Sequence, residues 1–146
     1  MHVVTGGAYN GKAKWVRDFY GLNETSNFQW ISAYLGADLP KELSVMDQDV
    51  MILEGVEQWV LQWLDNENIT DYRTYGRNVM QEWCNWTQGK SHRKLVVIGT
   101  DISKGIVPID GKTRKWRDIT GWFYQDLVAL SSRVDLIWYG IQKRLK

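Results

Sequence analysis

The sequence predicts an α/β fold in which a mostly parallel β-sheet is covered by helices on both faces. Residues 50–53 and 95–98 are continuous apolar runs, the composition of strands buried on both sides in a parallel sheet. Segments with the spacing of amphipathic helices alternate with the predicted strands, which is typical of parallel sheets. A glycine-rich stretch follows the first short apolar run. The chain has 146 residues and no internal repeat or long linker, so we expect one domain over residues 1–146.

The glycine-rich stretch has the spacing of a phosphate-binding loop. Gly6, four further residues, and then Gly11 and Lys12 fit the pattern G-x-x-x-x-G-K. Glycines allow the tight turn that points backbone N–H groups at an anion, the lysine adds a positive charge, and the following helix adds its N-terminal dipole. The sequence therefore predicts a three-layer, P-loop NTPase-like fold. The expected nucleotide-binding residues are Gly6, Gly7, Ala8, Tyr9, Asn10, Gly11, Lys12 and Ala13.

One position departs from the motif. Ala13 stands where the motif has Ser or Thr, whose hydroxyl ligates Mg²⁺ between the phosphates. Phosphate binding rests mainly on backbone N–H groups and is still expected, but loss of this contact weakens phosphoryl transfer by ~1–3 kcal/mol. A glycine-rich turn that binds no ligand is the alternative interpretation.

The elements after the loop are predicted from their apolar spacing. Residues 15–20 place their apolar side chains on one face of a helix that Gly21 ends. Residues 28–34 are rich in β-forming residues and place Phe28, Trp30, Ser32 and Tyr34 on one face, so a strand is predicted there. Residues 41–46 are expected to form a short helical turn. Residues 50–53 are the next strand.

Two helices are predicted after that strand. The first covers residues 56–64, and the second begins near residue 72 and ends near Gly89, with Asn68 or Thr70 as its cap. Their apolar faces are Val56, Trp59, Val60, Trp63 and Leu64 in the first helix and Tyr72, Tyr75, Val79, Met80 and Trp83 in the second.

The last third of the chain continues the alternation. The strand at residues 95–98 is followed by a loop over residues 103–112, which contains two glycines and a proline. Residues 115–132 have the spacing of a long helix, and residues 134–139 are predicted to be the closing strand.

Two acidic residues follow the predicted buried strands. Glu54 comes directly after residues 50–53, and Asp101 follows residues 95–98. The carboxyl ends of parallel strands meet at one edge of the sheet, where the glycine-rich loop also lies. We therefore expect Glu54 and Asp101 to hold Mg²⁺, with Lys12 and Asp101 as the catalytic residues.

The composition and net charge of the chain argue against two classes of binding partner. The chain is 44% hydrophobic and 24% charged with a net charge of +1, so neither nucleic acid nor an anionic membrane is expected to bind. There is no signal-like segment, and the single Cys84 suits a reducing compartment, so we expect a cytoplasmic protein. Among nine tryptophans, Trp59, Trp63 and Trp83 have helical spacing and are expected in the core.

Several short segments together resemble a known family. The segments are Thr-Gly-Gly-Ala at 5–8 with Gly-Lys at 11–12, Ile-Leu-Glu at 52–54, Gly-Ile-Val-Pro at 105–108, and Arg-Asp-Ile-Thr-Gly at 117–121 with Gln125. They are similar to adenosylcobinamide kinase/adenosylcobinamide-phosphate guanylyltransferase, the family that attaches the nucleotide loop of cobalamin.

The resemblance implies a parallel-sheet P-loop protein that assembles as a homotrimer and uses ATP or GTP. Its kinase activity phosphorylates the aminopropanol hydroxyl of the corrinoid adenosylcobinamide. Its transferase activity passes a guanylyl group through a histidine after the second strand. Substrate-binding or structural roles are carried over to Gly105, Pro108, Arg117, Asp118 and Gln125.

This chain departs from the family where that histidine is expected. The residues between Tyr34 and Val50 include no histidine, and the only two in the chain are His2 and His92. We therefore expect the kinase step to be retained and the guanylyltransferase step to be lost.

Three functions remain open from the sequence. The first is a corrinoid kinase in which Asp101 orients the acceptor hydroxyl. The second is a non-catalytic nucleotide-binding paralogue with a regulatory or assembly role, which Ala13 and the missing histidine favour. The third is a partner-binding domain that keeps the fold without the ligand and uses aromatic clusters such as Trp83/Trp86 and Trp122/Phe123/Tyr124 as an interface.

Overall fold

The computed structural model describes residues 1–40 and 42–146, and in them the chain forms six strands, four α-helices and one 3₁₀ helix. The strands are β1 (His2–Gly6), β2 (Phe28–Ser32), β3 (Val50–Glu54), β4 (Lys94–Thr100), β5 (Arg133–Trp138) and β6 (Ile141–Arg144). The helices are α1 (Lys12–Tyr20), η1 (Ala33–Leu35), α2 (Val56–Trp63), α3 (Tyr72–Gly89) and α4 (Gly111–Leu130).

The strands form one mostly parallel sheet in the order β2-β3-β4-β1-β5-β6. β1 lies between β4 and β5 and pairs with both in parallel, with Gly6 opposite Thr100 at the carboxyl end. β6 pairs with β5 in antiparallel fashion. The predicted α/β class is confirmed. The two strands predicted from continuous apolar runs, β3 and β4, each have a neighbouring strand on both sides.

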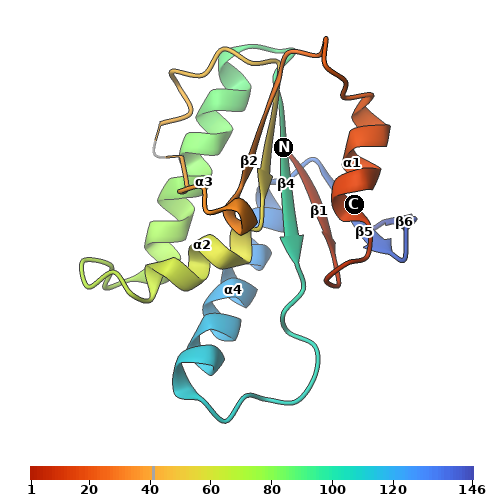
Figure 1. Ribbon diagram of the computed structural model, residues 1–146. Helices are drawn as coiled ribbons and strands as arrows, with labels where there is room; N and C mark the ends of the chain where they lie inside the picture. Colours follow the sequence, from red (N-terminus) through yellow and green to blue (C-terminus); the bar gives the residue numbers. More distant parts are fainter. Residues whose placement is uncertain (41) are drawn as a thin grey trace.

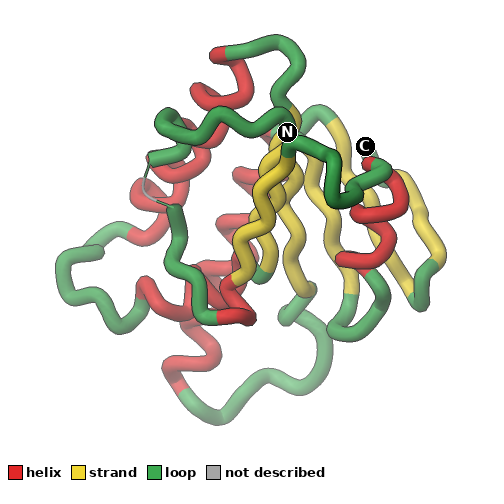
Figure 2. The backbone as a smooth tube through the Cα atoms, turned by 45° about the horizontal axis from the view of Figure 1, so that its top comes forward, coloured by secondary structure: helices red, strands yellow, loops and turns green. Residues whose placement is uncertain are grey.

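Helices cover both faces of the sheet unequally. Figure 1 shows α2, α3 and α4 on one face and α1 on the other, and Figure 2 shows the strands side by side between these layers. The larger core lies under α2, α3 and α4 and contains the predicted core tryptophans Trp59, Trp63 and Trp83, which are 1%, 6% and 1% exposed. The smaller core lies under α1, where Val16 packs on Val4 and its neighbours.

Some element boundaries differ from the prediction. The second strand ends at Ser32 and not at residue 34, because Ala33–Leu35 turn into η1. The last helix begins at Gly111, four residues earlier than predicted, because the Asp110 carboxylate accepts a hydrogen bond from the Thr113 N–H at 2.7 Å and caps it. It ends at Leu130 and not at residue 132.

Three further predictions need correction. The cap of α3 is Asp71, whose carboxylate accepts hydrogen bonds from the N–H groups of Arg73 and Thr74 at 3.0 Å, and neither Asn68 nor Thr70 takes this place. The closing strand covers Arg133–Trp138, and the hairpin partner β6 was not predicted. Of the predicted helical turn, residue 41 lies outside the described residues, and residues 43–46 form a hydrogen-bonded turn instead of a helix.

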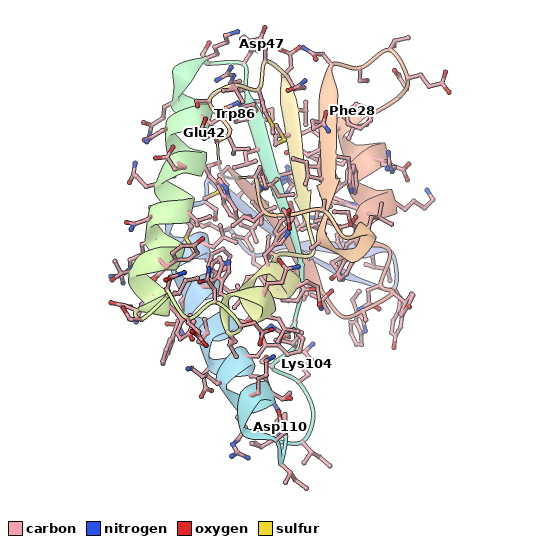
Figure 3. All side chains as sticks on the ribbon, turned by 60° about the vertical axis from the view of Figure 1, so that its left-hand side comes forward. Phe28, Glu42, Asp47, Trp86, Lys104 and Asp110 are labelled. Atoms are coloured by element: carbon pink, nitrogen blue, oxygen red, sulfur yellow. The ribbon has the colours of Figure 1, made fainter. Side chains whose placement is uncertain are left out.

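The amino and carboxyl edges of the parallel strands lie at opposite ends of the molecule. In Figure 3, Asp47 and Trp86 lie at one end of the molecule and Lys104 and Asp110 at the other. The latter two belong to the long loop between β4 and α4, at the carboxyl edge of the parallel strands. Within the described residues, no helix has the length and apolar character needed to cross a membrane.

Candidate nucleotide site

The glycine-rich loop connects β1 to α1 at the carboxyl edge of the sheet. Gly6 ends β1 at a point where a Cβ atom would lie 2.1 Å from the Ile137 carbonyl oxygen of β5, so only glycine allows the two backbones to approach. Tyr9 has a positive φ of 56°, a conformation that non-glycine residues adopt rarely and that is concentrated at functional sites. The sequence therefore forms the turn that the motif predicts.

Backbone donors of this loop are free for a ligand. Within residues 1–40 and 42–146, the N–H groups of residues 7–14 donate no hydrogen bond, and intrahelical bonding begins with Trp15 N–H to the Gly11 carbonyl. These N–H groups lie at the N-terminus of α1, where the helix dipole is positive. Free N–H groups at a helix N-terminus are the chemistry by which backbone binds anions in proteins.

Lys12 is held inside the loop. Its side chain is buried, and Nζ donates hydrogen bonds to the carbonyl oxygens of Gly7 at 2.7 Å and Gly6 at 3.3 Å. Burial lowers the pKa of the Lys12 ammonium, while the nearby carboxylates of Glu57 and Glu54 partly oppose this shift. A buried cation with two backbone carbonyls as partners is placed to exchange them for phosphate oxygens.

Two carboxylates face this loop. Glu54, at the end of β3, accepts a hydrogen bond from Trp30 Nε1 at 2.9 Å through Oε2. Glu57, in the first turn of α2, is 1% exposed and accepts hydrogen bonds from the Thr100 N–H at 2.9 Å and from the Tyr34 hydroxyl. Burial and the bond to Glu57 raise the pKa of Tyr34, so its phenol stays protonated and acts as the donor.

These groups surround a cavity of about 670 Å³. This volume lies within the ~300–1,000 Å³ range of small-molecule sites. The cavity is bordered by residues 8–14 of the loop and the start of α1, and by Tyr34, Glu54, Glu57, Gln58, Thr100 and Ile102. Gly6 and Gly7 contribute the carbonyl groups that hold Lys12. The structure thus brings together the predicted loop and Glu54.

Asp101 lies on the other side of the β4 tip. It borders a second cavity, beside α4, and Oδ1 accepts hydrogen bonds from the Ser103 N–H at 2.9 Å and Ser103 Oγ at 2.5 Å. Thr100 and Ile102, the residues on either side of it, border the first cavity, beside the glycine-rich loop, which is called the nucleotide cavity below after its candidate ligand. The predicted acid pair is therefore split between two neighbouring cavities.

The other predicted family residues are spread over the β4–α4 segment. Arg117 donates hydrogen bonds to the carbonyl oxygens of Ile106 at 2.9 Å and of Ser103, and so ties the loop to α4. The Pro108 carbonyl accepts from Arg114 at 2.9 Å, and Gly105 has a positive φ of 93°. These three residues shape the loop. Asp118 and Gln125 are exposed on α4 and border neither of the two cavities described above.

Glu57 is a member of the site that the sequence did not predict. The sequence feature that could have indicated it is an acidic residue beside the apolar face of a predicted helix, three residues after Glu54. Tyr34 was predicted only as a strand residue, and its placement in the site depends on the unpredicted turn η1.

The fold and the site define a P-loop nucleotide-binding protein. The family model described as CobU, cobinamide kinase/cobinamide phosphate guanyltransferase, matches residues 23–145, and the chain belongs to this family of nucleotide-binding kinases of cobalamin biosynthesis. Because the match begins after the glycine-rich loop, the geometry of residues 6–13 is a separate observation. No curated protein matches the chain.

Proposed function

We propose that this chain is a kinase that transfers the terminal phosphoryl group of ATP or GTP to a cobinamide-type corrinoid and lacks the guanylyltransferase step. The observation that carries the proposal is the arrangement around Lys12, with free loop N–H groups on one side and Glu54 on the other. Family membership supplies the substrate class, since the family is described as cobinamide kinase and guanyltransferase.

In this proposal, residues 6–13 bind the phosphates. The loop N–H groups donate hydrogen bonds to the anionic phosphate oxygens, and the Lys12 ammonium leaves the Gly6 and Gly7 carbonyls to contact the transferred group. Charge at these oxygens increases toward the transition state, so a lysine already desolvated in the site stabilises it without reorganising water.

The acidic residues fit a magnesium ion. Mg²⁺ is bound in such sites by one or two carboxylates together with substrate phosphates. Glu54 uses only Oε2 toward Trp30, which leaves Oε1 for the ion or its bound water, whereas both Glu57 oxygens accept hydrogen bonds within the described residues. Bound Mg²⁺ neutralises charge on the phosphates. We therefore assign the metal contact to Glu54 and a positioning role to Glu57.

Asp101 is assigned to the acceptor. It borders the neighbouring cavity while Thr100 and Ile102, on either side of it, border the nucleotide cavity. A carboxylate at this boundary is suited to accept a hydrogen bond from an acceptor hydroxyl and orient its oxygen toward the phosphoryl group. This is the role of the corresponding base in phosphoryl transfer.

The position of the histidines supports loss of the guanylyl step. His2 begins β1 and His92 precedes β4, so both lie at the amino edge of the parallel strands, opposite the loop. His2 is also engaged by Tyr20 and Asp135, and His92 lies 3.1 Å from Asp49. Neither is placed to attack a nucleotide bound at Lys12.

We also propose that the chain forms a homo-oligomer, a trimer by its family resemblance. The β5–β6 hairpin at the sheet edge carries Trp138, Tyr139 and Ile141, which are 64%, 78% and 74% exposed. Neighbouring exposed apolar residues of this size are typical of association surfaces. Light scattering of the purified protein tests this assignment.

The test of the kinase is corrinoid-dependent nucleotide turnover. We expect ADP or GDP to be released from the Mg-nucleotide faster when cobinamide is present, with Trp15 fluorescence in α1 changing on nucleotide binding. Saturable nucleotide binding without corrinoid-dependent turnover would favour the second candidate, a non-catalytic nucleotide-binding paralogue. Ala13, which places no hydroxyl in the loop, is the observation that favours this alternative.

A further inference from the structure

A second cavity of about 330 Å³ lies beside the nucleotide cavity, on the α4 face of the sheet. Its walls come from α4, the β4 tip, β1, β5 and the C-terminal residues. They include Asp101, Ile102, Thr120, Gly121 and Tyr124. Ile102 borders both cavities, so a molecule in this one would lie next to a nucleotide in the other.

The inner part of this cavity is apolar but contains one unsatisfied hydroxyl. Val3, Thr120 and Val134 are at most 3% exposed. Thr120 Oγ1 is buried and has no hydrogen-bond partner within the described residues, although an intrahelical carbonyl is the usual partner of a helical threonine. Buried polar groups are almost always paired, so a hydroxyl in a cavity wall that has no protein partner is available to a group that enters the cavity.

The two cations of the cavity, Arg117 and Lys146, and one oxygen of Asp101 already have hydrogen-bond partners. Asp101 accepts two hydrogen bonds from Ser103, and Arg117 donates to loop carbonyl oxygens. Lys146 Nζ donates to the carbonyl oxygens of Val128 and Ala129 at 2.9 and 3.2 Å. The recognition chemistry left for a ligand is therefore an apolar surface, one neutral hydroxyl, and Oδ2 of Asp101 at the boundary with the nucleotide cavity.

Tyr124 connects one wall of the cavity to the backbone of β4. Its hydroxyl donates to the Thr100 carbonyl at 3.2 Å, directly over Gly99, where a Cβ atom would lie 1.8 Å from the oxygen. Burial raises the pKa of Tyr124, so the phenol remains a neutral donor. This contact fixes one wall of the cavity against β4.

We propose that this cavity binds a neutral aliphatic arm of the phosphoryl acceptor, with Thr120 Oγ1 hydrogen-bonded to an amide or hydroxyl group of that arm. The volume is at the lower end of the ~300–1,000 Å³ range of ligand sites, so it admits a side arm and excludes a macrocycle. The assignment to the acceptor rests on the proposed kinase function. The arm would pass Asp101 on its way to the nucleotide cavity.

Gly121 allows the cavity to be filled without disturbing the fold. A Cβ atom at this position meets nothing within 4 Å, and glycine in a helix interior is unfavourable. Gly121→Leu therefore occupies the cavity and preserves or raises the melting temperature. Ala129→Leu, on the exposed side of α4, adds a leucine to the same helix as a matched control.

The test uses N-(2-hydroxypropyl)acetamide, a small neutral amide alcohol, titrated into the ¹⁵N-labelled full chain. We expect saturable shifts of the amide resonances of Thr120, Gly121 and Tyr124 in wild type and Ala129→Leu, and none in Gly121→Leu. Thr120→Val, which keeps the shape and removes the hydroxyl, should weaken binding about 3- to 10-fold without lowering the melting temperature. No saturable shift in wild type, or equal shifts in Gly121→Leu, overturns the proposal.

The kinase assay separates this proposal from the function on which it rests. Gly121→Leu should raise the cobinamide KM at least 10-fold and leave nucleotide affinity within about 2-fold of wild type. Fragment binding without any phosphorylation of cobinamide would support the cavity and contradict the kinase. Phosphorylation with an unchanged cobinamide KM in Gly121→Leu would support the kinase and contradict the cavity assignment.

Discussion

The Lys12 ammonium donates a hydrogen bond to the Gly7 carbonyl oxygen at 2.7 Å, across the loop that precedes its own helix. This hydrogen bond holds the lysine side chain in the site at which it is proposed to act. Burial there lowers the pKa of the Lys12 ammonium. A phosphate group is a stronger partner than a carbonyl oxygen for a desolvated cation. When nucleotide binds, we expect the Lys12 ammonium to exchange the Gly7 carbonyl oxygen for a phosphate oxygen.

Lys12→Met should therefore weaken nucleotide binding. Hydrogen bonds to charged groups contribute ~1.5–3 kcal/mol, so we expect the Kd for Mg-ATP or Mg-GTP to rise about 10- to 100-fold. Titration followed by tryptophan fluorescence measures this change. Lys90→Met, which removes an exposed lysine paired with Asp47 at the other end of the molecule, is the control. Equal affinities in both variants and wild type would mean that the loop is only structural.

Ala13→Thr should increase the rate of phosphoryl transfer. The added hydroxyl restores the ligand that the motif provides for Mg²⁺. We expect a gain of roughly 10-fold in kcat, equivalent to ~1.4 kcal/mol. Ala13→Val has the same shape without the hydroxyl and should show no gain. A rate that is the same in the two variants would show that residue 13 does not contact the metal.

Glu54→Gln should change the dependence on magnesium. The amide keeps a carbonyl oxygen for Trp30 Nε1 but removes the charge, so the Mg²⁺ concentration for half-maximal activity should rise about 10-fold. Glu57→Gln is the comparison, because its oxygens already accept from Tyr34 and Thr100. We expect it to lower the free energy of unfolding by ~1–3 kcal/mol and to leave the magnesium dependence unchanged. If Glu57→Gln instead raised the Mg²⁺ requirement and Glu54→Gln did not, Glu57 would be the metal ligand and Glu54 the positioning residue.

The elements and residues predicted correctly are those whose structure depends on a short, local pattern of residue types. Glycine spacing identified the loop, and continuous apolar runs identified β3 and β4 together with Glu54 at the strand end. These features depend on residues close together in the chain. They were predicted because backbone geometry and burial on both faces leave a direct signature in residue type.

What the sequence did not predict depends on tertiary placement. Asp101 and Glu54 both follow buried strands, but the turn after β4 puts Asp101 beside α4. Glu57 is buried because Tyr34, from the unpredicted turn η1, and the Thr100 N–H close over its carboxylate. Contacts between residues 34, 57 and 100 leave no local pattern. The hairpin partner β6 was also missed, since its strand is short and mostly exposed.

A buried histidine predicts how stability depends on pH. His2 is 4% exposed, with Nε2 2.7 Å from Asp135 Oδ2 and Nδ1 2.8 Å from the Tyr20 hydroxyl. Burial lowers the pKa of His2 from its ordinary value of 6.5, despite the hydrogen bond to Asp135. The unfolded chain therefore binds this proton at a higher pH than the folded one. Its contribution to stability is complete above about pH 6.5 and is lost as the pH falls toward the lowered folded pKa.

Urea unfolding at pH 7.5 and pH 5 measures this effect. We expect wild type to lose stability at the lower pH, and His2→Gln to be less stable at pH 7.5 but to lose less between the two values. His92→Gln, which changes an exposed histidine near Asp49, controls for titration of the other imidazole. A wild-type loss that is unchanged in His2→Gln would assign the pH dependence to other groups.

The most direct test of the account is the mass of the corrinoid after incubation with Mg-GTP or Mg-ATP and the purified protein. We predict that cobinamide gains one phosphate group, that Lys12→Met abolishes or strongly slows this gain, and that no corrinoid carrying a guanylyl group accumulates with GTP. An unmodified corrinoid in the presence of saturably bound nucleotide would contradict the kinase. A guanylylated product would contradict the loss of the transferase step.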